Sequence, residues 1–389
     1  MDLDNSLKTT QSSTIDTDWR KSGVRLLRKH PEIWIALLLW FASNVFVGAF
    51  ANLARWEFAG QYYKMQDLCR WDCNWYGTVV AEGYDRSAFR ETSEANWAFS
   101  PVFPLTAYPF YHWFKLSAPL SMVLASKAAL LLAIYSFMLM VRDMTDNVGD
   151  RFLAGSLVAF NPYLIYGHAG YAEPLFFALL TLAFFFAWQR RWLLSGLAGG
   201  LVSGTRILGF LFASSYTLVC LRDAGWRRFW RRFTPVQLIG LLLCPLGTSL
   251  FMLYLYHVSG DALAQAHIQV AWNRAVGGNP FHTLMICFKY HHWLRVWGVM
   301  AIAGLLIGVW ELFSDKPELG IFLIPYLLIP LASSYKAVPR YVFWQPAFLY
   351  AIFLILRRYR SWWPVYIAFA AGMACFVVVG WVTGRDFVI

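Results

Sequence analysis

The chain has 389 residues, of which 59% are hydrophobic and only 14% are charged, and its mean hydropathy is +0.47. Because a soluble domain is usually about half apolar and about a quarter charged, this composition excludes an ordinary soluble protein and indicates an integral membrane protein. The net charge of +11 does not indicate nucleic-acid binding, because the basic residues stand in short clusters between apolar runs, as they do in the cytoplasmic flanks of membrane spans.

The N-terminal tail, residues 1–30, is polar and carries a basic cluster just before the first apolar run, residues 31–54. Cytoplasmic flanks of membrane spans are enriched in Lys and Arg, so we expect a cytoplasmic tail, of which residues 1–18 are disordered. The apolar run is too long and begins too late for a cleavable signal peptide. The sequence therefore predicts a single transmembrane domain, residues 31–389, after this tail.

Apolar runs that could cross a membrane recur along the rest of the chain, and together they predict an all-α fold with about eleven spans. The later runs lie at residues 101–116, 119–141, 152–166, 174–187, 192–221, 236–258, 293–312, 319–331, 341–356 and 363–382.

One of these runs, residues 192–221, has basic residues at both flanks and should cross the membrane an even number of times, although it is short for two full spans. We predict two short helices that meet near Gly204-Thr205-Arg206, part-way through the membrane, where an interrupted helix is tolerated if it lines a cavity. This topology places the two longest polar connections, residues 55–100 and 259–292, on the same extracytoplasmic side. We expect the chemistry there, in loops that carry short interfacial helices.

The first of these loops contains Arg70-Trp71-Asp72, followed by Trp75 and Tyr76. A carboxylate held beside tryptophans at the membrane surface is partly desolvated, which raises its pKa and makes it a better proton acceptor. Asp72 is therefore the candidate general base. The alternative is that Asp72 only pairs with Arg70 or caps a helix.

The six cysteines have no zinc-binding spacing. Four of them lie in or beside apolar runs, which is typical of small core residues. Cys69 and Cys73 flank the Arg70-Trp71-Asp72 segment. Their spacing makes a disulfide awkward, so we expect free thiols.

Ionisable residues that interrupt apolar runs are costly and are functional candidates. His168 and Glu173 stand near the outer end of a span, although Glu173 could also serve only a helix N-terminus. Arg206 is too far from either basic flank to snorkel, and its guanidinium suits a phosphate; the alternative is an ion pair with Glu173 or Asp72. Lys127 has a long stem, so we expect it to snorkel to the surface.

The second outer loop has polar and aromatic residues at near-helical spacing, with a histidine and an arginine close by: Asp261, Gln265, Gln269, Trp272, His267 and Arg274. Such side chains suit sugar hydroxyls and sugar rings, and an amphipathic helix resting on the membrane shows the same pattern. The other histidines of the loop lack a metal-ligand spacing, so no metal is expected. Lys336 and Arg340, at the outer end of a late span, could neutralise a lipid phosphate.

Taken in chain order, these segments resemble the PIG-V type mannosyltransferases, a branch of the GT-C superfamily. The similar segments are Arg70-Trp71-Asp72 with Trp75-Tyr76 and Gly83-Tyr84, Phe99 to Pro104, Asn161-Pro162 with Tyr171 to Phe176, Thr205-Arg206 with Gly209, Trp272 with Arg274 and Pro280, and Arg340-Tyr341 with Pro346. The resemblance implies a helical GT-C fold in a bacterial inner membrane, with a periplasmic active site. An endoplasmic reticulum membrane with a lumenal site is the alternative.

The resemblance also implies inverting transfer of a sugar, mannose, from a polyprenyl-phosphate donor to a glycan, lipid or protein acceptor, without a metal or cofactor. Asp72 would take the proton of the acceptor hydroxyl, and the donor phosphate would bind Arg206, Arg340 and Lys336. The remaining substrate contacts are expected from Arg70, Trp71, Trp75, Tyr76, His168, Tyr171, Glu173, His267, Gln269, Trp272 and Arg274.

Two other functions remain open from the sequence. A transporter or flippase for a lipid-linked sugar would also need buried charges, although it would not need two long loops on one side. An O-antigen ligase or polymerase would also work at the outer face, with a diphosphate donor in place of a monophosphate.

Overall fold

The computed structural model describes residues 30–90, 94–225, 233–272, 274, 277–289, 292–336 and 338–385, and over these residues the backbone forms helices and turns without a β-strand. The predicted all-α fold is therefore confirmed. The predicted tail, apart from His30, and the basic cluster at residues 227–232 lie outside the described residues.

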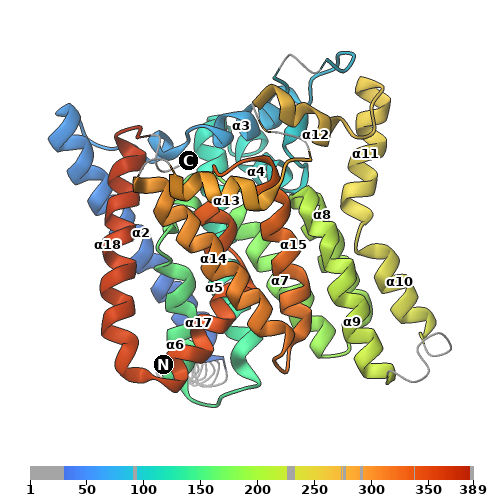
Figure 1. Ribbon diagram of the computed structural model, residues 1–389. Coiled ribbons are helices and arrows are strands. Elements are labelled where there is room, and N and C mark those ends of the chain that lie inside the picture. The colour runs from blue at the N-terminus through green and yellow to red at the C-terminus, as the bar shows by residue number, and fades with distance from the viewer. Residues whose placement is uncertain are drawn as a thin grey trace, which may run out of the picture.

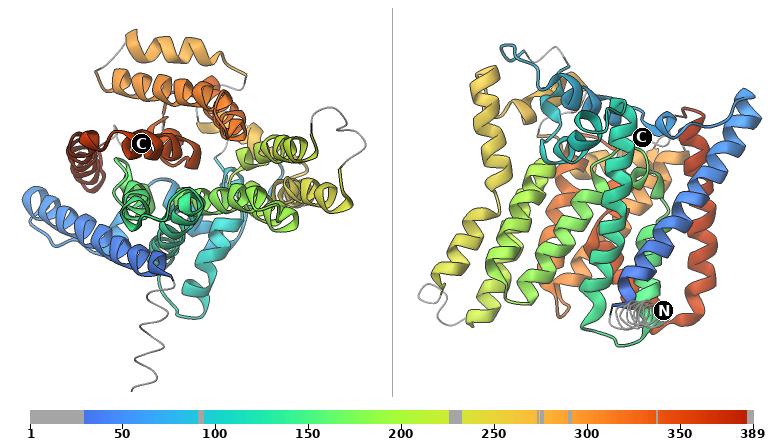
Figure 2. Two further views of the ribbon diagram at one scale, coloured as in Figure 1. Left: turned by 90° about the horizontal axis from the view of Figure 1, so that it is seen from below. Right: turned by 180° about the vertical axis from the view of Figure 1, so that it is seen from behind.

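A bundle of helices runs between two ends of the molecule, and Figure 1 and Figure 2 show these helices side by side. They are α2 (Pro31–Ala59), α5 (Ala118–Arg142), α6 (Val148–Ala159), α7 (Glu173–Trp188), α8 (Trp192–Thr205), α9 (Phe212–Ala224), α10 (Pro235–Leu243), α11 (Leu246–Ser259), α14 (His292–Leu312), α15 (Pro317–Ser333), α17 (Pro346–Arg358) and α18 (Trp363–Val382).

Shorter helices gather at one end of the bundle, which we call the loop end and which is at the top of Figure 1. They come from both predicted outer loops and from the junctions between bundle helices: η1 (Met65–Leu68), α3 (Asp72–Glu82), η2 (Asn96–Ala98), α4 (Val102–His112), η4 (Ile207–Leu211), α12 (Ala264–His267), η6 (Ile268–Trp272), α13 (Pro280–Lys289) and α16 (Val338–Phe343). Another short helix, η3 (Leu164–Gly167), connects α6 to α7 inside the bundle, where a Cβ on Gly167 would meet Leu130 of α5. Both loops thus lie at one end of the bundle and carry short helices, as predicted, while the extracytoplasmic location of this end stays a prediction. A last short helix, η7 (Arg360–Trp362), lies between α17 and α18 at the opposite end.

Five helical segments in the described part of the chain are long and apolar enough to cross a membrane, or six if the bent pair α10–α11 counts as one span. α2 exposes Leu38, Phe41 and Leu53 along its length, and a row of exposed apolar side chains on such a helix suits lipid rather than water. The chain is therefore a multi-pass membrane protein. The expected total of about eleven spans stays a prediction.

The boundaries of two predicted segments differ from the structure. α2 continues to Ala59 and ends where Gly60 adopts a positive φ of 60° and donates its backbone N–H to the Trp56 carbonyl, so the predicted first loop begins too early. The predicted span at 236–258 is two helices, α10 and α11, bent by 46°. Pro245 stands at this break, and a proline lacks the N–H that would continue the helical hydrogen bonds.

The block at residues 192–221 is broken as predicted. α8 ends at Thr205, Arg206 has an extended backbone with φ −149° and ψ 137°, and η4 and α9 follow. Arg206 separates α8 from η4 and α9 at the loop end. Because its backbone is extended, its side chain does not belong to the face of either helix. The break therefore places one guanidinium beside the short helices described above.

The core of the bundle is built around α7, which packs against α5 and α8. Apolar side chains surround α7 on all sides, and Phe176, Phe177 and Phe184 are fully buried. A helix that is apolar all round must be enclosed by others, as α7 is. It begins at Glu173, so the central helix of the bundle delivers a carboxylate to the loop end.

Glycines allow α8 to pack directly against the backbone of α10 and α11. A Cβ atom on Gly247 would overlap the backbone of Gly200 and Gly204, and one on Gly196 would overlap the backbone of Gly240. Small residues at such spacing let membrane helices approach closely without a driving force from water. This contact fixes α8, and with it the position of Arg206.

We expect Gly247→Ala to lower the free energy of unfolding by about 1–3 kcal/mol, because the added methyl group has no room between the two helices. Gly372→Ala in α18 is the matched control, since a Cβ there meets no atom within 4 Å. The control should be neutral or slightly stabilising, because alanine favours a helix over glycine. Thermal unfolding in detergent would measure both, and equal effects of the two substitutions would contradict the close contact.

Candidate active site

The turn before α3 holds Asp72 in an unusual position. Trp71 has φ 50° and ψ −115°, a conformation that costs a residue with a side chain about 1–3 kcal/mol. The Trp71 ring packs edge-on against Trp381 with the centroids 4.7 Å apart. The Tyr171 hydroxyl accepts a hydrogen bond from the Asp72 backbone N–H at 3.3 Å and donates to the Arg70 carbonyl at 3.2 Å. The fold therefore stabilises a strained turn, and this turn sets the direction of the Asp72 side chain.

A disulfide closes the same turn. Cys69 and Cys73 are bonded, with their Cα atoms 5.2 Å apart, so the expectation of free thiols was wrong. The expectation assumed a regular backbone between the two residues. Cys69 instead lies before the helix in an extended conformation, and the turn at Trp71 brings the first residues of α3 back toward it.

Replacing both cysteines with alanine should lower the free energy of unfolding by up to about 2 kcal/mol, because the short loop is no longer closed in the unfolded chain. Activity should also fall, since the turn that orients Asp72 loses one of its supports. A thiol reductant should have the same effect on the wild-type protein and none on the double variant, while Cys375→Ala, at a free cysteine, should change neither property. Full activity of the double variant would mean that Trp71 and Tyr171 hold the turn alone.

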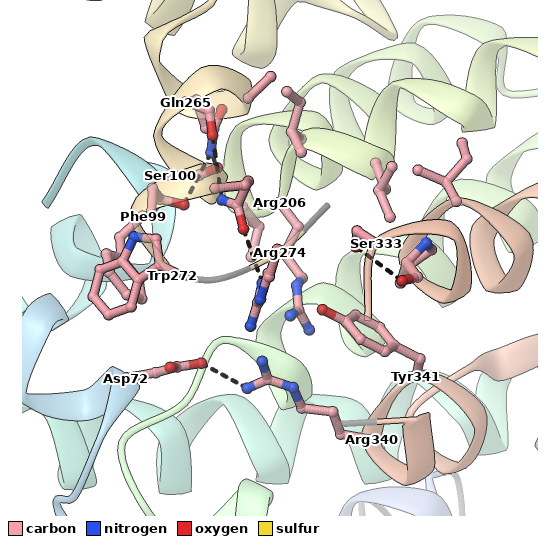
Figure 3. Close-up of a pocket in the computed structure, with 18 of the residues that line it drawn as sticks. Asp72, Phe99, Ser100, Arg206, Gln265, Trp272, Arg274, Ser333, Arg340 and Tyr341 are labelled. Carbon is pink, nitrogen blue, oxygen red and sulfur yellow. Dashed lines mark hydrogen bonds and ion pairs between the residues drawn. The ribbon is translucent and has the colours of Figure 1, made fainter. Parts of the chain in front are cut away.

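A cavity of about 490 Å³ opens at the loop end beside Asp72. Figure 3 shows Asp72 and Arg340 facing each other on one side, Trp272 and Phe99 on a second, and Tyr341 on a third, with the guanidinium groups of Arg206 and Arg274 between them. Both outer loops, η4 and the ends of α15 and α16 contribute lining residues: Asp72, Tyr76, Ala98, Phe99, Ser100, Thr205, Arg206, Ile207, Leu208, Phe210, Gln265, Ala266, Gln269, Trp272, Arg274, Gly277, Ile329, Pro330, Ala332, Ser333, Arg340 and Tyr341.

Charged residues alternate in sign beside the cavity, with Asp72, Arg340 and Arg206 in its lining and Glu173 behind them. Arg340 Nη1 lies 2.6 Å from Asp72 Oδ2, and Arg340 Nε lies 3.6 Å from Glu173 Oε1. The same Glu173 oxygen accepts a hydrogen bond of 2.7 Å from Arg206 Nη1. The alternative in which Arg206 pairs with Glu173 is therefore what the structure has, and Glu173 lies behind the cavity wall, with its side chain only 2% exposed.

The Asp72 carboxylate pairs with Arg340. The alternatives, in which Asp72 pairs with Arg70 or caps a helix, are not what the structure has. Arg70 Nη2 donates to the Val382 carbonyl, and the start of α3 has no side-chain cap. Burial raises the pKa of the Asp72 carboxyl, but the guanidiniums of Arg340, Arg274 and Arg206 lower it more, so that this pKa lies below its ordinary value. The expected raised pKa was therefore wrong in direction, because the sequence did not reveal the arginines from distant segments.

Aromatic rings form the wall opposite these charges. Trp75 stacks on Phe99 with the centroids 6.1 Å apart, and Trp272 meets Trp75 edge-on at 5.0 Å. Tyr76 packs on Phe99 from the other side, at 4.9 Å. The first and second loops therefore build this wall together, and the side chains of Tyr76, Phe99 and Trp272 reach the cavity.

Amide groups lie beside the aromatic wall. Gln265 donates through Nε2 to Ser100 Oγ at 2.7 Å, while its Oε1 is buried and has no hydrogen-bond partner. Gln269 Oε1 accepts a hydrogen bond of 2.9 Å from Arg274 Nη1. Trp272 Nε1 is also buried without a partner. Unpaired buried polar atoms are rare in native proteins, so those beside a cavity point to a polar ligand.

Seven of the predicted site residues line the cavity: Asp72, Tyr76, Arg206, Gln269, Trp272, Arg274 and Arg340. Others support it from behind, namely Arg70, Trp71 and Tyr171 at the turn, Trp75 in the aromatic wall, and Glu173 between the arginines. His267 pairs instead with Asp261, at 2.6 Å between Nδ1 and Oδ2, and Lys336 is exposed outside the lining.

His168 lies in a buried polar cluster away from the cavity. Its Nε2 is 2.7 Å from Ser43 Oγ, and its Nδ1 is 3.1 Å from Lys127 Nζ. Lys127 also donates to Asn44 and is only 6% exposed, so the expected snorkelling was wrong. A chain of polar partners inside the bundle keeps both side chains there, and sequence spacing does not show such partners.

Phe99, Ser100 and Tyr341 were not expected as site residues from the sequence, and Gln265 was expected only as one of the second-loop side chains that suit sugar hydroxyls. A signal existed for three of the four. Phe99 and Ser100 begin the segment to Pro104 that resembles the PIG-V type sequences, and Tyr341 follows Arg340 directly. Within the described ranges, no group of three or more His, Cys, Asp or Glu residues could hold a metal ion.

No protein-family model and no curated protein sequence matches this chain. Solved structures with a similar fold include the following two. ArnT from Cupriavidus metallidurans, solved bound to undecaprenyl phosphate, is 16% identical with a TM-score of 0.54, over 88% of this chain and 64% of ArnT. The archaeal oligosaccharyltransferase AglB from Archaeoglobus fulgidus, solved with an inhibitory peptide and a dolichol-phosphate, is 13% identical with a TM-score of 0.51, over 92% of this chain and 56% of AglB.

The likeness covers most of this chain, while this chain spans less than two thirds of either solved protein. At such low identity the likeness concerns the fold. The predicted GT-C fold is confirmed, and membership of the PIG-V branch stays a prediction.

Proposed function

We propose that this chain, a multi-pass membrane protein with the GT-C fold, is a glycosyltransferase that moves a sugar from a polyprenyl-phosphate donor to an acceptor hydroxyl with inversion. The observation that carries the proposal is the cavity in which one carboxylate, Asp72, lies beside three guanidiniums, those of Arg206, Arg274 and Arg340. Such a transfer needs two protein groups in one place: cations that bind the donor phosphate and a carboxylate that accepts the acceptor's proton. ArnT and AglB, which have the same fold, were solved with undecaprenyl phosphate and a dolichol-phosphate.

The charge of the site favours a monophosphate donor. Three guanidiniums against two carboxylates, Asp72 and Glu173, leave one uncompensated positive charge. A polyprenyl-phosphate sugar is a phosphodiester with a single negative charge, which would neutralise this excess. A polyprenyl-diphosphate sugar carries a second negative charge that the described site would leave unpaired, at a cost when the group is desolvated.

The shape of the cavity supports one orientation of the donor. Apolar residues from η4 and the end of α15, among them Phe210 and Ile329, line one part of the cavity and are also exposed on the outside. The polyprenyl chain would leave there toward lipid. The sugar would then face Trp272 and Gln265, whose unpaired polar atoms and aromatic ring suit hydroxyls and a sugar face.

The proposed reaction is one displacement. The acceptor oxygen forms a bond to the anomeric carbon while the bond from that carbon to the phosphate oxygen breaks, and the electron pair leaves with the phosphate. Asp72 takes the acceptor proton. Arg206 and Arg340 stabilise the extra charge on the departing polyprenyl phosphate, and Arg274 adds a third positive charge near it.

Asp72 and Glu173 are already neutralised by guanidiniums, so the site does not need a divalent cation to balance them. The proposed reaction accordingly needs no cofactor. Mannose as the sugar, a glycan, lipid or protein as the acceptor, and a periplasmic site in a bacterial inner membrane rest on the sequence resemblance and belong to the same proposal.

The test is transfer in proteoliposomes that contain the purified protein, a polyprenyl-phosphate mannose labelled in the sugar, and a mixture of glycan and lipid acceptors. Labelled product and free polyprenyl phosphate are expected in equal amounts, with the polyprenyl-diphosphate sugar much less active. Preferential use of the diphosphate would favour the ligase or polymerase alternative. Movement of intact donor between leaflets without sugar release would favour a flippase and overturn the proposal.

A further inference from the structure

Arg340 has two tasks that conflict. Its Nη1 atom lies 2.6 Å from Asp72 Oδ2. If the donor phosphate binds as proposed, the same guanidinium must face that phosphate. A carboxylate held by a guanidinium is a poor proton acceptor, because the positive charge stabilises its ionised form.

Of these two partners, Arg340 is the more firmly fixed. Its side chain is 5% exposed, and its guanidinium carbon lies 5.8 Å from the ring centres of Tyr166 and Tyr171 and 5.5 Å from that of Tyr341. Glu173 holds it from a third direction, at 3.6 Å from Nε. The Asp72 side chain is 26% exposed and lies on the cavity surface at the start of α3.

We propose that Asp72 and the donor phosphate compete for the guanidinium of Arg340, so that Asp72 is released to act as the base only after the donor has bound. Arg340 is then a positioning residue for Asp72 as well as a phosphate ligand. Binding is ordered as a result, with the donor before a productive acceptor. This inference rests on the proposed function, since it takes the donor to be a lipid phosphate.

The groups around Asp72 are consistent with a release of this kind. Arg274 and Arg206 also lower the pKa of its carboxyl, while Glu173 lies on the far side of Arg340. The hydroxyl of Tyr171 contacts the backbone of Asp72, and Tyr76, from the same helix as Asp72, lines the cavity. None of these groups replaces the hydrogen bond that Arg340 donates to the carboxylate. Loss of that bond to a phosphate would therefore remove the largest of the arginine effects that lower the pKa of Asp72.

The test is the affinity of the protein for undecaprenyl phosphate in nanodiscs, measured by calorimetry without acceptor. Asp72→Asn replaces the charged competitor with a neutral amide of the same shape, whose hydrogen bond to Arg340 is weaker. The variant should therefore bind at least about tenfold more tightly than the wild type, as expected for the loss of one charge-assisted hydrogen bond. Asp67→Asn is the matched control in the same loop. It lies outside the cavity lining, retains an oxygen for the Lys64 backbone N–H, and should leave the affinity unchanged.

Equal or weaker binding by Asp72→Asn, with normal binding by the wild type, would overturn the competition. Failure of the wild type to bind undecaprenyl phosphate at all would instead contradict the proposed function. The pH profile gives a second readout that a structural role of Arg340 would not produce. The acid limb of kcat, which reports the complex, should lie at higher pH than the acid limb of kcat/KM, which reports the free enzyme. Coincident limbs would count against the release of Asp72.

Discussion

Asp72→Asn is expected to slow sugar transfer by about 10²–10⁴-fold, because an amide cannot take the proton from the attacking hydroxyl. The variant should remain folded. Asparagine has the same shape as aspartate, its oxygen can still accept a hydrogen bond from Arg340, and the disulfide and the Tyr171 contacts that hold the turn do not involve the Asp72 side chain. Single-turnover transfer from a labelled polyprenyl-phosphate sugar would measure the rate of the chemical step.

Asp67→Asn serves here too as the control, since it removes a carboxylate from the same loop without touching the cavity. It should transfer at the wild-type rate. If Asp72→Asn transferred sugar as fast as this control, Asp72 could not be the base. If it transferred slowly but also failed to bind the donor, the defect would lie in the fold of the loop rather than in proton transfer.

The second large effect is expected at Arg206, and it separates a structural role from a chemical one. Arg206→Met leaves the carboxylate of Glu173 buried with only the more distant Arg340, at 3.6 Å from Nε. Breaking a buried ion pair from one side typically costs about 3–5 kcal/mol. Adding Glu173→Gln removes the uncompensated charge, so the double variant should recover most of the lost free energy of unfolding.

Transfer should not recover in the same way. The double variant still lacks the guanidinium that stabilises the departing phosphate, and losing one such donor typically slows turnover by about 10²–10³-fold. Glu173→Gln alone is the control, because it keeps all three arginines of the cavity and should retain more transfer than either variant that lacks Arg206. Thermal unfolding and transfer rates of the three variants would show whether Arg206 acts on stability alone or also on transfer. A double variant as active as Glu173→Gln would mean that Arg206 serves only as the counter-ion of Glu173.

The helices of this protein could be predicted from the sequence because hydrophobic runs record where the chain is covered by lipid or by other helices. The break at Arg206 could also be predicted, since a charge in the middle of an apolar block is costly unless it faces a polar partner or a cavity. The bend between α10 and α11 was missed. It depends on Pro245 and on the glycine contact with α8, and hydropathy does not record either of these.

Seven of the predicted site residues line the cavity, but the pairings between them could not be predicted from the sequence. Asp72 and Arg340 are 268 positions apart, and nothing local to Asp72 shows that an arginine from α16 reaches it. The pKa of Asp72 was predicted in the wrong direction because this arginine partner was not visible in the sequence. His168 was misplaced for the same reason, because Ser43 and Lys127, its partners inside the bundle, come from two other helices.

The Cys69–Cys73 bond also has a consequence for how the protein matures in the cell. Thiols are kept reduced in the cytosol and are oxidised in the periplasm or the endoplasmic reticulum. On the proposed topology, in which the loop end faces the periplasm or the lumen, a newly inserted chain would acquire the closed turn only after its first loop has been translocated. The proposed activity would then follow insertion rather than accompany it. Cells that lack a thiol-oxidising system would accumulate full-length protein in the membrane with this turn still open.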